Sequence, residues 1–152
     1  MAGSISKGTI RRLNTAVGSV PSGNEILGSL GQLGGFVVNA DASVKLSSGD
    51  CIAVPDSGGA AGTYRVMFPN INSDIQSIAW FDVAGFTPRN PTGVETCAAR
   101  VCGYNFDATL KQWYITVQIV LLSSGAVDPT PPANFVVGVR AAFVLTPQAN
   151  PQ

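Results

Sequence analysis

Two long segments in the second half of the chain carry an apolar residue at every second position. Every odd position is apolar from Trp113 to Leu121 and again from Phe135 to Leu145. Successive side chains of a β-strand point to opposite faces of the sheet, whereas a helix repeats about every 3.6 residues. The segments 113–122 and 134–145 are therefore predicted to be strands, each spanning roughly 30 Å or more at ~3.3 Å per residue.

Shorter β-type runs precede these two segments, and Gly, Pro, Asn or Asp residues separate them. They cover residues 36–38, 44–46, 51–54, 63–68, 75–83 and 96–104. In the fourth run Tyr64, Val66 and Phe68 share one face. Seven or eight strands with frequent turns and no credible helix predict an all-β fold, an antiparallel two-sheet β-sandwich of the jelly-roll type. The order of the strands within the sheets stays open.

The first 35 residues differ from the rest in charge and glycine content. Residues 1–24 carry three basic side chains and no acidic one, and several glycines interrupt the segment. We interpret 1–35 as a flexible, mildly basic arm, 36–147 as the sandwich body and 148–152 as a C-terminal tail. The arm residues expected to contact a partner are Lys7, Arg11, Arg12, Ile26 and Leu30. A solvated Arg11-Arg12 dipeptide is the alternative to docking on an acidic surface.

The last predicted strand is apolar on its even positions as well. These positions include Val136, Ala142 and Val144, and Arg140 is their only charge. A strand that is apolar on both faces is either central or covered by something else. One small sandwich cannot bury both faces of this strand, so we expect a subunit interface at Val136, Arg140, Ala142 and Val144. Burial of this face beneath the arm is the alternative.

Composition narrows the possible functions. The 152 residues contain nine basic and nine acidic side chains, no histidine and three cysteines, and only 12% are charged. The lack of histidine excludes Ser-His-Asp and Cys-His catalysis, and a net charge of zero argues against nucleic-acid binding. No segment is long and apolar enough to predict a membrane span, and the N-terminus lacks the order of a secretory signal.

The three cysteines match neither a disulfide framework nor a metal-binding motif. Cys51, Cys97 and Cys102 are odd in number and lack metal-ligand spacing. Because Cys97 and Cys102 are five positions apart in one predicted strand, their side chains point to opposite faces and cannot pair. Free thiols in a protein made in a reducing cytoplasm are expected.

Three short patterns resemble catalytic or metal motifs, and each has a simpler explanation. Asp56-Ser57-Gly58 resembles the aspartic-protease signature, but the turn residues Pro55 and Gly59 flank it. The oxygen side chains of Asn70, Asn72 and Asp74 lack the glycine and glutamate of a calcium loop. Ser4 and Lys7 match a Ser-x-x-Lys pattern within the predicted arm. No catalytic, cofactor or metal site is predicted. The aromatic residues, Trp80 and Tyr104 among them, are assigned mainly to core packing, with a carbohydrate-stacking platform as the alternative.

A charge-poor chain without histidine, with an N-terminal arm and a jelly-roll body, resembles the decoration (cement) proteins of tailed-bacteriophage heads. The resemblance covers residues 36–147, is architectural, and rests on the segments 62–66, 103–107, 113–117, 131–134 and 141–145. The pattern is also similar to the terminal knobs of phage fibres and to trimeric domains of the tumour-necrosis-factor type. The latter are usually secreted and often disulfide-bonded, which fits this chain less well.

The resemblance implies a structural role in a virion assembled in the host cytoplasm. It implies a homotrimer that binds the outer surface of the capsid and bridges major capsid subunits, without cofactor, nucleic acid, membrane or small-molecule substrate. The principal alternative is a receptor- or glycan-binding knob of a phage fibre. A dimeric hydrolase that uses Asp56 is a third hypothesis.

Overall fold

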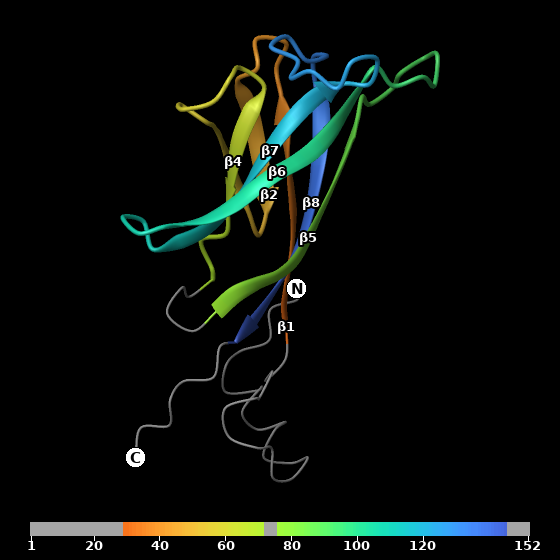
Figure 1. The fold of residues 1–152 in the computed structure, drawn as a ribbon. Coiled ribbons are helices and arrows are strands. Elements are labelled where there is room, and N and C mark those ends of the chain that lie inside the picture. The colour runs from red at the N-terminus through yellow and green to blue at the C-terminus, as the bar shows by residue number, and fades with distance from the viewer. Residues whose placement is uncertain (1–28, 72–75, 146–152) are drawn as a thin grey trace, which may run out of the picture.

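The computed structural model describes residues 29–71 and 76–145, which form eight strands and no helix (Figure 1). The strands are β1 (Ser29–Val38), β2 (Val44–Gly49), β3 (Ile52–Pro55), β4 (Thr63–Met67), β5 (Gln76–Phe86), β6 (Cys97–Asp107), β7 (Gln112–Leu121) and β8 (Phe135–Leu145). Each run of alternating residues in the sequence corresponds to one of these strands. The all-β prediction is therefore confirmed.

The strands form two antiparallel four-stranded sheets that pack face to face. Sheet A has the order β2-β1-β8-β5, and sheet B has the order β3-β4-β7-β6. The first strand pairs with the last, β1 with β8, and the inner strand β4 pairs with β7. The two packed sheets form the predicted antiparallel two-sheet β-sandwich.

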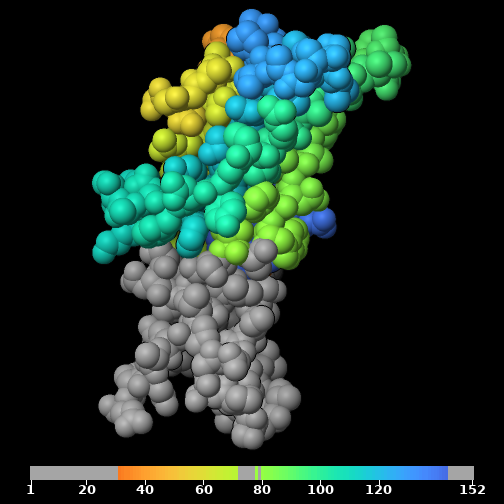
Figure 2. All heavy atoms as spheres, viewed as in Figure 1, coloured from red at the N-terminus to blue at the C-terminus, as the bar shows by residue number. Residues whose placement is uncertain are grey.

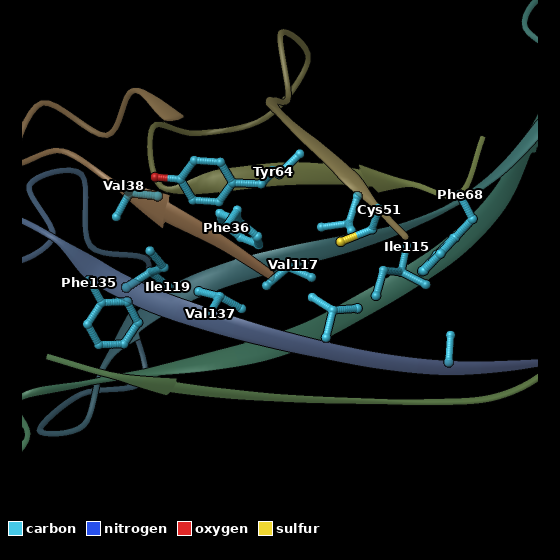
Figure 3. Close-up of a cluster of buried hydrophobic side chains, with 14 of the residues drawn as sticks. Phe36, Val38, Cys51, Tyr64, Phe68, Ile115, Val117, Ile119, Phe135 and Val137 are labelled. Carbon is cyan, nitrogen blue, oxygen red and sulfur yellow. The ribbon is translucent and has the colours of Figure 1, made fainter. Parts of the chain in front are cut away.

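The core lies between the sheets and is built from the inward faces that the alternation predicts (Figure 3). Fully buried side chains of β8 and β7 lie at alternate positions, as at Val137, Phe143 and Val117. Aromatic rings join the two sheets: the ring centroids of Phe36 and Tyr64 are 5.2 Å apart, and those of Phe68 and Phe143 are 5.1 Å apart. The odd positions of β8 therefore form its inner face.

Residues 29–35 belong to strand β1 of the sandwich, which corrects the predicted arm of residues 1–35. Strand β1 pairs with β2 on one side and β8 on the other, and Leu30 pairs in register with Phe143. Two glycines taken as signs of flexibility instead permit close packing. A Cβ on Gly34 would lie 2.6 Å from the Sγ of Cys51, and one on Gly35 would lie 2.7 Å from the carbonyl oxygen of Val137.

Both ends of the described sandwich lie at the same end of sheet A. In the antiparallel pair of β1 and β8, Ser29 is opposite Val144, so residues before 29 and after 145 attach at this end. The loops 39–43, 56–62, 87–96 and 122–134 lie at the opposite end (Figure 1). The predicted arm residues Lys7, Arg11, Arg12 and Ile26 and the predicted tail 148–152 lie outside the described residues.

A candidate self-association face on sheet A

The outward-pointing residues of sheet A form an apolar surface that we call the A face. Near the loop end, the strand registers align four apolar side chains across all four strands. Val37 of β1 pairs with Leu46 and Val136, and Val136 pairs with Phe86. Leu46 and Phe86 are 48% and 50% exposed, and the two valines between them are half-buried. An apolar row therefore crosses the full width of the sheet.

Two further rows continue the A face toward the other end. Leu33 of β1 is opposite Arg140 of β8, and Trp80 of β5 is opposite Ala142. Leu33 is 67% exposed and Trp80 is 47% exposed, although both side chains are large and apolar. Large apolar side chains at both ends of one sheet surface are unusual for a protein that works alone in water.

Very small residues occupy the middle of the A face. Gly138 and Ala84 are paired on β8 and β5, and Gly31 lies further along β1. A Cβ on Gly138 would find its nearest atom 3.8 Å away, and one on Gly31 would find none within 4 Å. Among the described residues nothing therefore requires glycine at either position, although glycine inside a strand weakens a sheet. Glycines of this kind often mark a place where another backbone approaches closely.

The A face carries little charge. Besides the exposed Lys45 at the bulge of the edge strand β2, which donates to the Oδ1 of Asn134 at 2.7 Å, the strands of sheet A contain two charged residues, Asp82 and Arg140. These are cross-strand neighbours, and the Nη2 of Arg140 lies 3.3 Å from the Oδ2 of Asp82. The guanidinium of Arg140 also lies over the ring of Trp80, with 5.4 Å between its Cζ and the ring centroid. The two charges therefore compensate each other on an otherwise apolar surface.

The outer face of sheet B is polar by contrast. Figure 2 shows the molecule from this side. On it, Arg65 bonds to Asp56 through an Nε–Oδ1 contact of 3.0 Å and lies over the ring of Tyr114, and Arg100 donates to the Oε1 of Gln118 at 2.8 Å. Its exposed large apolar side chains, Ile52 and Val54, belong to the short edge strand β3. The outer surface of sheet B therefore carries more charged and hydrogen-bonding side chains than the A face.

A second exposed apolar group lies on the hairpin of β6 and β7, which projects from the body (Figure 1). The Tyr104 ring is 59% exposed and lies 5.8 Å from Phe81 and 6.5 Å from Trp113, measured between centroids. Phe106 lies 5.5 Å from Trp113. A bulge between Val101 and Gly103 changes the alternation of β6 and turns these rings to the side of Trp113. Their tilts of 44–55° do not make one flat platform.

The short motifs have structural roles where the structure describes them. Asp56 accepts a hydrogen bond from the backbone nitrogen of Gly58 at 3.2 Å, which closes a turn, and its ion pair with Arg65 holds the turn against β4. Asn72 and Asp74 lie outside the described residues, as do Ser4 and Lys7. Within residues 29–71 and 76–145, no three His, Cys, Asp or Glu side chains gather as metal ligands would. No helix long and apolar enough to span a membrane occurs in the same residues.

All three cysteines are free, and their orientation agrees with their spacing. Cys97 is buried, and Cys102, five positions later, is exposed. Burial and the nearby charge of Asp50 raise the pKa of the Cys51 thiol to about 11. Burial also raises the pKa of the Cys97 thiol, which donates to the Oδ2 of Asp128 at 3.2 Å. The two buried thiols therefore stay protonated and unreactive at neutral pH.

The residues predicted for a subunit interface lie on β8, and the structure describes three of their side chains. Val136 is half-buried and Arg140 is exposed, both on the A face. Ala142 is buried within the chain, so its side chain adds little surface. Val144 belongs to β8, but its side chain is outside the described set, as is that of Leu30.

The sequence did not identify the largest side chains of the A face. Leu33, Leu46, Trp80 and Phe86 lie on three other strands and join β8 only through the registers of the sheet. The prediction that the aromatic residues belong mainly to the core does not hold for Trp80, which is 47% exposed. A bulge between Ile78 and Trp80 shifts the alternation by one residue and turns the indole outward.

Comparisons of the chain with protein-family models, curated proteins and solved structures find no significant match.

Proposed function

We propose that this chain is a structural, non-enzymatic protein of a bacteriophage virion. In this proposal it associates with itself as a trimer through the A face and binds the outer surface of the capsid, where it bridges major capsid subunits. The observation that carries the first part is the contrast between the apolar A face and the polar outer face of sheet B. The architectural resemblance to decoration proteins supports the second part.

The size of the A face suits contact with another copy. Three strands of ten or eleven residues and the six-residue β2, spaced ~4.8 Å apart at ~3.3 Å per residue, present a flat area on the order of 500 Å² before side chains are counted. Stable interfaces bury about 800 Å² on each partner. In a cyclic trimer whose axis passes in front of the A face, each copy contacts both neighbours through this face, and its flanking edges add the remaining area.

The position of the chain ends suits attachment to a shell. Because Ser29 and Val144 are opposite each other, the residues carrying Lys7, Arg11 and Arg12 are tethered to one end of the sandwich. In a trimer whose axis runs along the strands, three such segments start from the same end. Three weak contacts to one rigid capsid then reinforce one another by avidity.

Self-association is tested by sedimentation of the full chain and of two matched variants. We expect the wild type to sediment as a trimer. Val136→Asp, which places a charge on the A face, should sediment as a folded monomer. Gln118→Asp, on the outer face of sheet B, is the control and should remain a trimer. A wild-type chain that stays monomeric at all concentrations would contradict the proposal.

Capsid binding is tested by co-sedimentation with expanded, undecorated heads of the phage that encodes the chain. We expect the wild type to pellet with the heads at saturable stoichiometry and the Val136→Asp monomer to bind at least about tenfold more weakly, because avidity is lost. A trimer that does not pellet with the heads would contradict the decoration role and leave self-association intact.

One observation favours a fibre knob that binds glycans, which is the second candidate function. The exposed Tyr104 ring, beside Phe81, could stack on a sugar. A glycan-array signal that Tyr104→Ala abolishes, together with no binding to heads, would favour the knob over the decoration protein.

A further inference from the structure

The ion pair on the A face is loosely made within the chain. Arg140 and Asp82 meet through one contact of 3.3 Å, and their side chains are 63% and 62% exposed. Charge-assisted hydrogen bonds are usually shorter, about 2.7–2.9 Å. A guanidinium has five N–H donors and a carboxylate accepts at about four sites. No other hydrogen bond to either side chain comes from the described residues, so most of this capacity is directed outward.

Covering the A face removes water from both charges. One contact of 3.3 Å leaves most of the hydrogen-bonding capacity of this pair unmet once water is removed, so association is favoured by a partner that supplies groups of opposite sign at matching positions. A second copy of this chain has one cation and one anion at the same spacing. An acidic or a basic partner would complement only one of the two charges. Charge complementarity therefore favours a copy of the chain as the occupant.

We infer that Arg140 of one copy pairs with Asp82 of the next copy when the chain associates through the A face. This inference rests on the proposed self-association and adds what selects the partner and sets the register. In a ring each copy gives its guanidinium to one neighbour and its carboxylate to the other, so every charge is paired. Trp80 is a positioning residue, because its ring lies under the guanidinium and holds it near the face.

Exchanging the two charges separates pairing between copies from pairing within a chain. The double variant Asp82→Arg/Arg140→Asp keeps an opposite pair in each chain and keeps opposite charges between identical copies. Against a wild-type copy, however, arginine would face arginine and aspartate would face aspartate. The exchanged variant should therefore associate with itself and reject the wild type.

The experiment co-expresses the two full-length chains with different affinity tags and counts mixed oligomers by native mass spectrometry. The matched control is Arg100→Gln/Gln118→Arg, which exchanges a hydrogen-bonded pair on the outer face of sheet B. We expect the control to mix with the wild type at random. Mixed oligomers of the A-face variant should be at least about tenfold rarer, since like charges facing each other disfavour the wrong partner.

The outcomes separate this inference from the proposed function. If the wild type is an oligomer and the exchanged variant mixes with it as freely as the control, the pair stays within each chain and the inference is wrong. A monomeric wild type instead overturns the proposed self-association. If the exchanged variant does not fold, the single variants Asp82→Arg and Arg140→Asp give a second test. Each alone should associate at least about tenfold more weakly, and the two should prefer each other when co-expressed.

Discussion

The Tyr64 hydroxyl is a buried polar group at the loop end of the core. The side chain is fully buried, and its Oη donates to the carbonyl oxygen of Ala42 at 3.0 Å. Burial, with Asp128 and Asp41 nearby, raises the pKa of Tyr64 to about 12. The folded protein thus holds this proton at pH values where the unfolded chain, with a pKa of about 10, has lost it.

Stability should therefore fall as the pH rises above about 10. The unfolded state releases the Tyr64 proton first, so the free energy of unfolding decreases between about pH 10 and 12, by about 2 kcal/mol in total. Tyr64→Phe is the control. At pH 8 it should be less stable than the wild type by about 1 kcal/mol, because the hydrogen bond to Ala42 is lost. Urea unfolding should show the wild type to be more stable than Tyr64→Phe at pH 8, and this difference in unfolding free energy should vanish or reverse at pH 11. An equal difference at both pH values would contradict the prediction.

Val139 tests which face of β8 is buried. Its side chain is 2% exposed and belongs to the core, whereas Val136, three positions earlier, is on the A face. Val139→Asp buries a charge without a partner and should cost at least about 3–5 kcal/mol, enough to unfold a marginally stable domain. Circular dichroism should show an unfolded chain for Val139→Asp and a folded one for Val136→Asp. A folded Val139→Asp variant would mean that the odd positions of β8 are not the inner face.

At the scale of elements, a substitution at Gly138 should weaken association through the A face without weakening sheet A. The residue lies inside β8, its φ is not positive, and an added Cβ would make only ordinary contact, 3.8 Å from the oxygen of Ala84. Gly138→Val should leave the melting temperature unchanged or raise it by a few degrees, since valine favours strands. The same side chain would hold a second copy away from the A face.

We therefore expect Gly138→Val to melt at the wild-type temperature or slightly above it. In sedimentation experiments the same variant should form a weaker oligomer than the wild type. Gly35→Val, on the neighbouring strand, is the contrasting variant. Its Cβ would lie 2.7 Å from a backbone oxygen, so it should destabilise the fold itself. If Gly138→Val associates as the wild type does, no copy approaches closely at this point.

How far the sequence predicts each element depends on how local its signal is. Strands β7 and β8 follow from alternation alone, because one buried face imposes a period of two. The predicted arm includes most of β1, because Gly34 and Gly35 suggest flexibility. In the structure these glycines instead allow close contacts with Cys51 and Val137. Their contact partners are distant in sequence, and a single sequence does not show them.

The A face was only partly predictable for the same reason. The even positions of β8 indicated an apolar outer face, and Val136 and Arg140 do lie on it. The rest of the face depends on the strand order β2-β1-β8-β5 and on three registers. The bulge before Trp80 reverses the direction of its side chain, and no local pattern marks that bulge.

At the scale of the whole molecule, the proposal separates two tasks along the chain. The described sandwich starts at Ser29 and contains both the core and the A face, whereas the basic residues Lys7, Arg11 and Arg12 precede it. A chain that lacks residues 1–24 keeps all eight strands that the structure describes. It should therefore fold, melt at the wild-type temperature and sediment as the same oligomer.

Deletion of residues 1–24 should nevertheless weaken binding to undecorated heads. Three arms act on one rigid surface, so loss of even a weak contact in each should reduce the apparent affinity by a factor on the order of 10². Arg11→Glu/Arg12→Glu in the full chain keeps the arm and reverses its charge. It should lower the affinity and make binding less sensitive to salt, because charge attraction is screened within about 10 Å at 0.1 M salt. If the deletion yields a monomer, the arm takes part in the contact between subunits, because every residue of the A face is still present.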